Sequence, residues 1–332
     1  MTMQSVNLKI PSQAKVKINI NEFILEGILI FIFICFAFAA PGFFTTANFF
    51  NILRNVSMQG IIAFGMTLVM ISGEIDLSVG SMVAFSGCLA AVITRDLTAI
   101  GISTNYAVII GMAVCLLVGI CAGVLTGWIR IRFNVPSFIT TLALMAGLYG
   151  GAFLLTNSFP VTSFPEWYSF FGSGYLLGVI PFPAIVFLVV FGVMWFVSKF
   201  TTFGRAVYAV GGNLESSRLS GINIVKVKMI SQALLGFLAA LSGILVSSQV
   251  QAGNPTVAKG WELDVISATV IGGVSMSGGK GRVWRTFIGV IFLGIILNGM
   301  TLLNVDEYWQ YVVKAVLILG AVLIYQAQEG KQ

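Results

Sequence analysis

The chain has 332 residues, of which 58% are hydrophobic and only 9% are charged. Because an ordinary soluble domain carries about 25% charged residues, this composition excludes a soluble globular protein. A bilayer span needs about 20 apolar residues, so the length allows roughly ten spans joined by short loops. No sizeable soluble domain fits beside them.

Basic residues outnumber acidic ones, 18 Lys and Arg against 12 Asp and Glu, which gives a net charge of +6. In a membrane protein this excess is typical of cytoplasmic loops, so we expect a lipid bilayer and no nucleic acid as partner. The chain has no histidine, the usual general base, metal ligand and intramembrane proton relay. Its four cysteines lie in apolar stretches without CxxC spacing, which predicts neither disulfides nor a metal site.

Ten apolar stretches follow one another along the chain. They cover residues 23–40, 60–72, 79–94, 106–127, 138–156, 176–197, 229–250, 265–276, 286–303 and 311–325. The second and eighth are short for a span, which predicts tilted, broken or re-entrant segments. The expected fold is therefore an all-α integral membrane protein with about ten transmembrane helices. Residues 23–325 form its single transmembrane domain, between an N-terminal tail (1–22) and a C-terminal tail (326–332).

The basic residues indicate the orientation of these spans. With the N-terminus in the cytoplasm, 14 of the 18 fall in cytoplasmic segments. Only Arg54, Arg95 and Lys259 fall in outside loops, and Lys314 lies within the last span. By the positive-inside rule, this segregation predicts that both termini are cytoplasmic.

The first apolar stretch has a second interpretation. The preceding lysines and the small-residue pattern Ala37-Phe38-Ala39 also resemble a cleavable signal peptide. Glu26 interrupts the apolar run, however, and the loop charges favour a retained first span. Glu26 and Lys314 each lie about one turn inside a span, where we expect their side chains to snorkel to the headgroups.

Within the spans, Gly119, Gly123 and Gly127 have the spacing by which small residues let membrane helices approach closely. We expect a packing role for them. No Asp, Glu or His lies near the middle of any predicted span, which argues against the proton relay of a proton-driven carrier.

The segment from Gly73 to Ser81, between the second and third spans, is rich in polar residues. It contains two acids and two serines between glycines. Asp76 or Ser78 can form the N-cap of the third span, or these side chains can face a polar pathway.

The longest cytoplasmic loop, residues 199–228, predicts a short helix. Asn213 can cap it, Glu215 lies in its first turn, and Gly221 can end it. Leu214 and Arg218, four residues apart, suit insertion into the groove of a partner protein. A helix lying on the lipid surface is the alternative.

A glycine-rich segment, residues 272–282, invites comparison with a phosphate-binding P-loop. That motif needs a glycine five positions before its Gly-Lys pair and Ser or Thr after it. Here those positions hold Val274 and Gly281. We therefore expect that this chain does not hydrolyse ATP and is not an enzyme.

Three blocks in the same order, residues 51–81, 208–223 and 262–316, resemble the permease subunits of ribose-type bacterial ATP-binding-cassette importers. The resemblance implies a multi-pass permease of the inner membrane that pairs with a second permease copy, as a homodimer. It also implies two cytoplasmic ATPase subunits, which use ATP and Mg, and a periplasmic sugar-binding protein. No cofactor is expected on this chain itself.

The resemblance also assigns the predicted loop helix. The importers' ATPase-coupling motif has Glu-Ala-Ala, three further residues and Gly; here it is Glu215-Ser216-Ser217 and then Gly221. The two alanines are serines, which are also small. The expected coupling loop comprises Asn213, Glu215, Ser216, Ser217, Arg218 and Gly221.

Neutral polar groups in the spans are candidates for the translocation pathway, since they can hydrogen-bond a neutral polyol without holding it tightly. Together with the pair before the third span, the candidates for pathway or gate are Asp76, Ser78, Thr140, Thr141, Gln249 and Asn298. Hydrogen bonds between helices are the alternative role for each group in a span.

We therefore expect a permease subunit that imports a sugar, such as a ribose-like pentose, a hexose or a related polyol, driven by a separate ATPase. The main alternative is a stand-alone, ion-coupled secondary transporter of a small neutral solute. A membrane-embedded enzyme is a distant third, because no catalytic constellation is present. Nothing in the sequence names the cargo.

Overall fold

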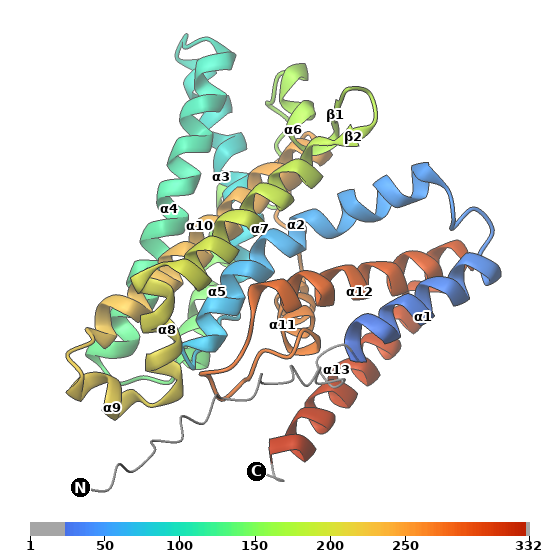
Figure 1. Ribbon diagram of the computed structural model, residues 1–332. Helices are drawn as coiled ribbons and strands as arrows, with labels where there is room; N and C mark the ends of the chain where they lie inside the picture. The colour runs from blue at the N-terminus through green and yellow to red at the C-terminus, as the bar shows by residue number, and fades with distance from the viewer. Residues whose placement is uncertain (1–23, 330–332) are drawn as a thin grey trace, which may run out of the picture.

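The computed structural model describes residues 24–329, and this part of the chain is almost entirely helical (Figure 1). The long helices are α1 (Ile24–Ala39), α2 (Thr46–Ile71), α3 (Val79–Ala99), α4 (Thr104–Arg132), α5 (Ser137–Thr156), α7 (Phe182–Phe200), α10 (Ile224–Val250), α12 (Val283–Leu302) and α13 (Glu307–Glu329). The shorter elements are η2 (Glu166–Tyr168), α6 (Ser169–Ser173), a hairpin of β1 (Tyr175–Leu176) and β2 (Ile180–Pro181), α8 (Thr202–Gly212), α9 (Leu214–Leu219) and α11 (Trp261–Ile271).

Seven of the described helices are long and apolar enough to cross a bilayer, which confirms an all-α membrane protein. They are α2, α3, α4, α5, α7, α10 and α12; α1 is apolar but shorter. The predicted count of ten spans stays a prediction, as do the cytoplasmic termini. The predicted N-terminal tail lies outside the described residues, and α13 continues helical to Glu329, past the predicted start of the C-terminal tail.

The predicted short second span was wrong, because α2 is a 26-residue helix that begins at Thr46. Thr45 caps it by accepting a hydrogen bond from the Asn48 backbone N–H at 3.2 Å. The first half contains many polar residues, so it does not stand out in the sequence as an apolar stretch. At about 1.5 Å per residue the helix is roughly 39 Å long, more than the thickness of the hydrocarbon core, and Figure 1 shows it running obliquely across the view.

The predicted short eighth span is confirmed. Helix α11 has only 11 residues, roughly 16 Å or half of the hydrocarbon core. It lies between two non-helical segments, residues 251–260 and 272–282. Such backbone is tolerated at membrane depth only where protein covers it or water lines it.

Helices α4 and α10 pack backbone against backbone, as the glycine spacing predicts. A Cβ placed at Gly119 would overlap the carbonyl of Gly236, and one at Gly123 would overlap that of Gln232. On its other face α10 packs against α2, whose second half is buried throughout. Helices α2 and α10 are the most buried of the candidate spans, and α4 packs against α10 at the edge of the molecule (Figure 1).

We predict that Gly123→Ala lowers the stability of the protein by about 1 to 3 kcal/mol, because the new methyl group must displace the α10 backbone. The measurement is the thermal midpoint of the purified protein in detergent, followed by size exclusion. Gly192→Ala in α7 is the matched control, since nothing lies within 4 Å of its new Cβ. Equal midpoints for the two variants would contradict the close α4–α10 contact.

Candidate functional site

The predicted loop helix is α9, and the structure confirms both of its ends. The Asn213 side-chain oxygen accepts a hydrogen bond from the Ser216 N–H at 2.8 Å, so Asn213 is the N-cap. Gly221 has φ of +79°, the left-handed conformation that ends helices, and its N–H donates to the Arg218 carbonyl at 3.0 Å. The sequence motif thus forms one short, capped helix.

Most of α9 is exposed at one end of the molecule (Figure 1). The exposed fractions of Leu214 and Leu219 are 48% and 82%. Ser217 is the exception and is buried, where α9 meets α8 and α10. A small side chain at this position permits the contact, while the exposed leucines leave an apolar surface available to a partner.

Helix α8 connects α9 to the ends of the transmembrane helices. A Cβ at Gly211 would overlap the carbonyl of Ile71, the last residue of α2. The same carbonyl accepts the Gly279 N–H at 2.8 Å, and the Tyr208 hydroxyl donates to the Gly281 carbonyl at 2.9 Å. The glycines of the 272–282 segment therefore allow α2, α8 and the segment before α12 to meet at backbone distance.

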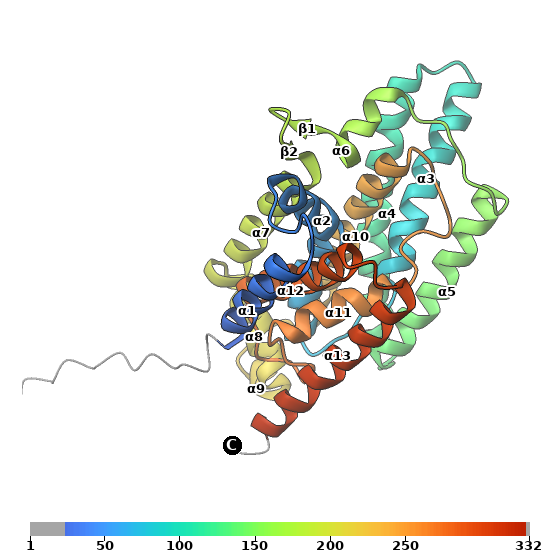
Figure 2. The ribbon, with the colours of Figure 1, turned by 90° about the vertical axis from the view of Figure 1, so that its right-hand side faces the viewer.

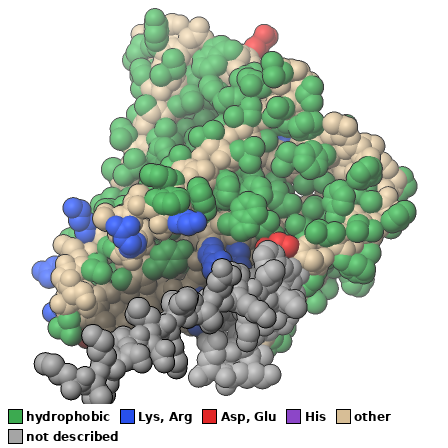
Figure 3. Space-filling view, viewed as in Figure 1, with side chains coloured by type: hydrophobic (Ala, Val, Ile, Leu, Met, Phe, Trp, Pro, Cys, Tyr) green, Lys and Arg blue, Asp and Glu red, His purple; other side chains and the backbone are tan. Residues whose placement is uncertain are grey.

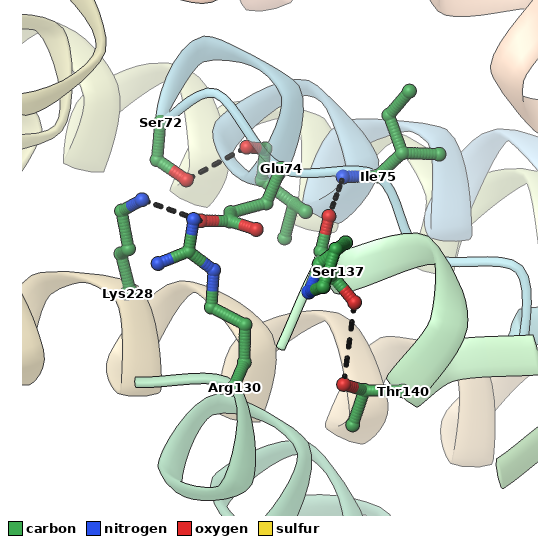
Figure 4. Close-up of polar contacts among 9 residues, drawn as sticks. Ser72, Glu74, Ile75, Arg130, Ser137, Thr140 and Lys228 are labelled. Atoms are coloured by element: carbon green, nitrogen blue, oxygen red, sulfur yellow. Dashed lines mark hydrogen bonds and ion pairs between the residues drawn. The ribbon is translucent and has the colours of Figure 1, made fainter. Parts of the chain in front are cut away.

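A buried charge cluster lies beside this junction (Figure 4). Glu74, which follows α2, is 3% exposed. Its Oε1 atom pairs with Nη2 of Arg130, from the end of α4, at 2.6 Å and with Nζ of Lys228, from the start of α10. Nearby, the Ile75 N–H donates to the Ser137 hydroxyl at the start of α5, at 3.3 Å. One carboxylate thus joins three chain segments.

The segment after Glu74 carries the two predicted gate residues. Asp76 Oδ1 accepts the backbone N–H of Ser78 at 2.7 Å and its hydroxyl at 2.6 Å, and both residues are buried. Ser78 occupies the N-cap position of α3, but its side chain caps no backbone group. Asp76 therefore orders the turn before α3. The cavity beside the pair is only about 10 Å³, so this part of the molecule is closed.

The non-helical segment before α11 packs along α3 (Figure 2). A Cβ at Gly253 would lie 2.8 Å from the Cα of Cys88, and one at Gly80 would lie 2.6 Å from the Ala258 carbonyl oxygen. Residues 253–258 therefore run antiparallel to α3, and bring the start of α11 next to the start of α3. A side-chain oxygen of Glu262, in the first turn of α11, lies beside Gly80. This juxtaposition was not predicted from the sequence, because it joins residues far apart in the chain.

A groove of about 250 Å³, which we call the polar groove because amide and hydroxyl side chains lie among its apolar walls, runs between α2, α11 and α12. Its polar lining consists of Asn51, Asn55, Gln59, Asp264, Asn298 and Thr301. Asn298 also forms a reciprocal amide pair with Asn48, each hydrogen bond being 2.9 Å long. The three α2 residues were not among the predicted pathway residues, although their spacing of four places them on one helix face.

The other pathway candidates lie elsewhere. Thr140 and Thr141 are buried near the start of α5, where their hydroxyls donate to the carbonyls of Pro136 and Phe138 at 3.4 and 3.3 Å. Gln249 is exposed near the end of α10. The structure does not bring the six predicted residues into one site, and their part in a pathway stays a prediction.

The interpretation of Lys314 as a snorkelling residue was wrong. Its Nζ pairs with Asp264 Oδ1 at 2.8 Å, and both side chains are largely buried. Gln59 also donates to Asp264, at 3.1 Å. Helix α11 begins at Trp261, earlier than the apolar pattern suggested, so Asp264 lies within a helix and neutralises Lys314 inside the protein.

Comparison with known proteins identifies the family. Residues 48–322 match the family described as branched-chain amino acid transport system / permease component. The chain belongs to this permease family. The match spans the helices from α2 into α13, including α8 and α9, so the capped helix and its junction lie within the family's common region.

Individual relatives are sugar permeases. The chain is 44% identical to the ribose import permease protein RbsC of Escherichia coli (strain K12), over 86% of this chain and 87% of the relative. It is 39% identical to the ribose import permease protein RbsC of Bacillus subtilis (strain 168), over 86% of each. The L-arabinose ABC transporter permease protein AraH of Azospirillum brasilense is 34% identical, over 94% of this chain and 90% of the relative. No solved structure matches the chain.

Two of these relatives are named for ribose and one for L-arabinose. This chain is a sugar permease of the ribose type and a multi-pass protein of the bacterial inner membrane. The amino-acid substrate in the family description is not shared by the relatives' names, which specify sugars. The resemblance seen in the three sequence blocks is confirmed.

We predict that Glu74→Ala lowers the stability of this permease by about 3 to 5 kcal/mol, because it leaves the buried Lys228 and the partly exposed Arg130 without a carboxylate. The thermal midpoint in detergent is the measurement. Asp96→Ala removes one partner of the exposed Arg95–Asp96 pair and should cost at most about 1 kcal/mol. Adding Lys228→Met to Glu74→Ala should recover part of the loss; a double variant as unstable as the sum of the singles would contradict the pairing.

Proposed function

We propose that this permease imports a pentose of the ribose type, received from a periplasmic binding protein and driven by a separate cytoplasmic ATPase. The main support for this substrate class is the 44% identity to a ribose import permease over most of both chains. The relatives named for arabinose and xylose are more distant, at 34% and 31% identity. Their substrates are also pentoses, which supports the same class of cargo.

The proposed coupling site is α9. Its fixed ends and exposed leucines supply a rigid, partly apolar element for a groove on the ATPase. A displacement of α9 passes to α8, and from α8 to the ends of α2 and the 272–282 segment through contacts between backbones. Close-packed elements of this kind switch between discrete arrangements rather than deform gradually.

The assembly that we propose contains two copies of this permease and two ATPase subunits. ATP and Mg are bound by the ATPase, and this chain holds no cofactor and performs no catalysis. The described structure is closed beside Asp76, and the cycle would open a path for sugar there or along the polar groove of α2 and α12. Neutral amides and hydroxyls in that groove suit the hydroxyl groups of a sugar.

We expect Leu219→Ser and Gly221→Val to abolish copurification of the ATPase and ATP-driven uptake, while membrane insertion is unchanged. The first removes an exposed apolar contact, and the second forces a β-branched residue into φ of +79°. Leu177→Ser is the control for copurification, because Leu177 is equally exposed, at 87%, but lies in the hairpin at the other end of the molecule. Normal ATPase binding by Leu219→Ser and Gly221→Val would refute the coupling assignment.

The energy source separates this proposal from an ion-coupled carrier. The acid Asp264 is the specific feature that such a carrier could use, but it is paired with Lys314. In cells with the complete transport system, uptake of labelled ribose should stop on ATP depletion and persist with an ionophore when ATP is maintained. Unlabelled arabinose and xylose should compete more weakly than ribose. Uptake that survives ATP depletion and collapses with the ionophore would establish the alternative.

A further inference from the structure

One groove of the molecule is not used by the proposed transport cycle. It is a groove of about 1020 Å³ between the end of α7, α8 and the start of α12. Its charged and aromatic lining comprises Lys199, Arg205, Arg282, Phe191, Trp195, Tyr208 and Trp284. We call it the α7–α8 groove. Among the described residues that line it, three are basic and none is acidic.

The groove lies at the level where membrane spans end. Helices α7 and α12 are both candidate spans, and Lys199 is in the last turn of the first while Trp284 is in the first turn of the second. Tryptophan and tyrosine gather at the boundary between hydrocarbon and headgroups, and basic residues gather on the cytoplasmic side. Figure 3 shows Lys and Arg side chains concentrated on the lower part of the face, where α7 and α8 come together (compare Figure 1).

The aromatic and basic groups are arranged together. Lys199 Nζ lies 5.3 Å from the centre of the Trp195 ring and 5.4 Å from that of Phe200, so the cation is held over an apolar surface. Trp284 stacks on Phe287 with ring centres 5.6 Å apart, which fixes the opposite wall. The Tyr208–Gly281 hydrogen bond of 2.9 Å holds α8 against the segment before α12.

We propose that the α7–α8 groove binds the headgroup of an anionic phospholipid, with its phosphate between Lys199 and Arg205 and its acyl chains along the tryptophans. The charge of the lining complements an anion, the aromatic walls suit acyl chains, and the position is that of a headgroup. The bound lipid would link α7, α8 and the start of α12. Since α8 leads into α9, a lipid here would stabilise the base of the proposed coupling helix.

Tryptophan quenching tests this assignment with the full chain in vesicles. Brominated phosphatidylglycerol replaces a growing fraction of phosphatidylcholine, and quenching of Trp195 and Trp284 reports occupancy. The variant Trp195→Phe/Trp284→Phe supplies the background from the other tryptophans. Brominated phosphatidylcholine with identical chains provides the comparison for the headgroup. We expect phosphatidylglycerol to be preferred.

Two exposed basic residues are the ones to change. Lys199→Gln and Arg205→Gln should each reduce the preference about fivefold, and the double variant more, since a basic residue at an anionic surface is worth about 1 kcal/mol. Arg282 makes a further contact of its own and stays unchanged in the test. Arg132→Gln is the matched control, because Arg132 is exposed at the end of α4 and does not line the groove. Each variant is accepted only with the wild-type size-exclusion profile.

Three results would overturn the proposal. Equal preference for phosphatidylglycerol in the wild type and the double variant would show that the lipid does not bind in the groove. Displacement of the lipid by inorganic phosphate at matched ionic strength would indicate a site for free anions. Loss of ATPase copurification in the double variant with unchanged lipid preference would make the groove a protein interface. None of these outcomes depends on which sugar is transported.

Discussion

Backbone that leaves a helix inside a membrane domain must find hydrogen-bond partners within the protein, and this requirement shapes the centre of the permease. Asp76 takes the N–H of Ser78, and Ser137 takes that of Ile75. Gly253 exchanges two hydrogen bonds with Val161, and the Gly279 N–H reaches the last carbonyl of α2. Backbone groups in these non-helical segments thus form hydrogen bonds within their own turn or with another chain segment. The non-helical segments therefore connect the helices to one another.

The glycines serve the same requirement. Gly119, Gly123 and Gly236 bring α4 and α10 into backbone contact, and Gly211 does so for α8 and α2. Without a hydrophobic force between helices in lipid, close packing and polar contacts hold such a bundle together. The buried Glu74 cluster adds charge to that junction and joins α4 and α10 to the end of α2.

Much of the fold could be predicted from local patterns, because apolar runs, caps and glycine spacings are local. The cap at Asn213 and the stop at Gly221 depend on residues within one turn, and both predictions were confirmed. The polar half of α2 was missed, because Asn48 finds its partner in Asn298, 250 positions away. Lys314 was misinterpreted for the same reason, since its partner Asp264 lies 50 positions earlier. Contacts between distant segments decide whether a polar residue in a span faces lipid, protein or a path.

The shortness of α9 has a consequence for how work is transmitted. Six residues are far fewer than an isolated helix needs for stability in water, so α9 is held by its two ends and by the buried Ser217. In the proposed cycle this piece acts as a lever whose stiffness is set by one asparagine and one glycine. If a substitution weakened either end of α9, the ATPase could complete its cycle while the helix bends and no sugar moves. Such a substitution would raise the number of ATP molecules hydrolysed per sugar and leave the affinity for sugar unchanged.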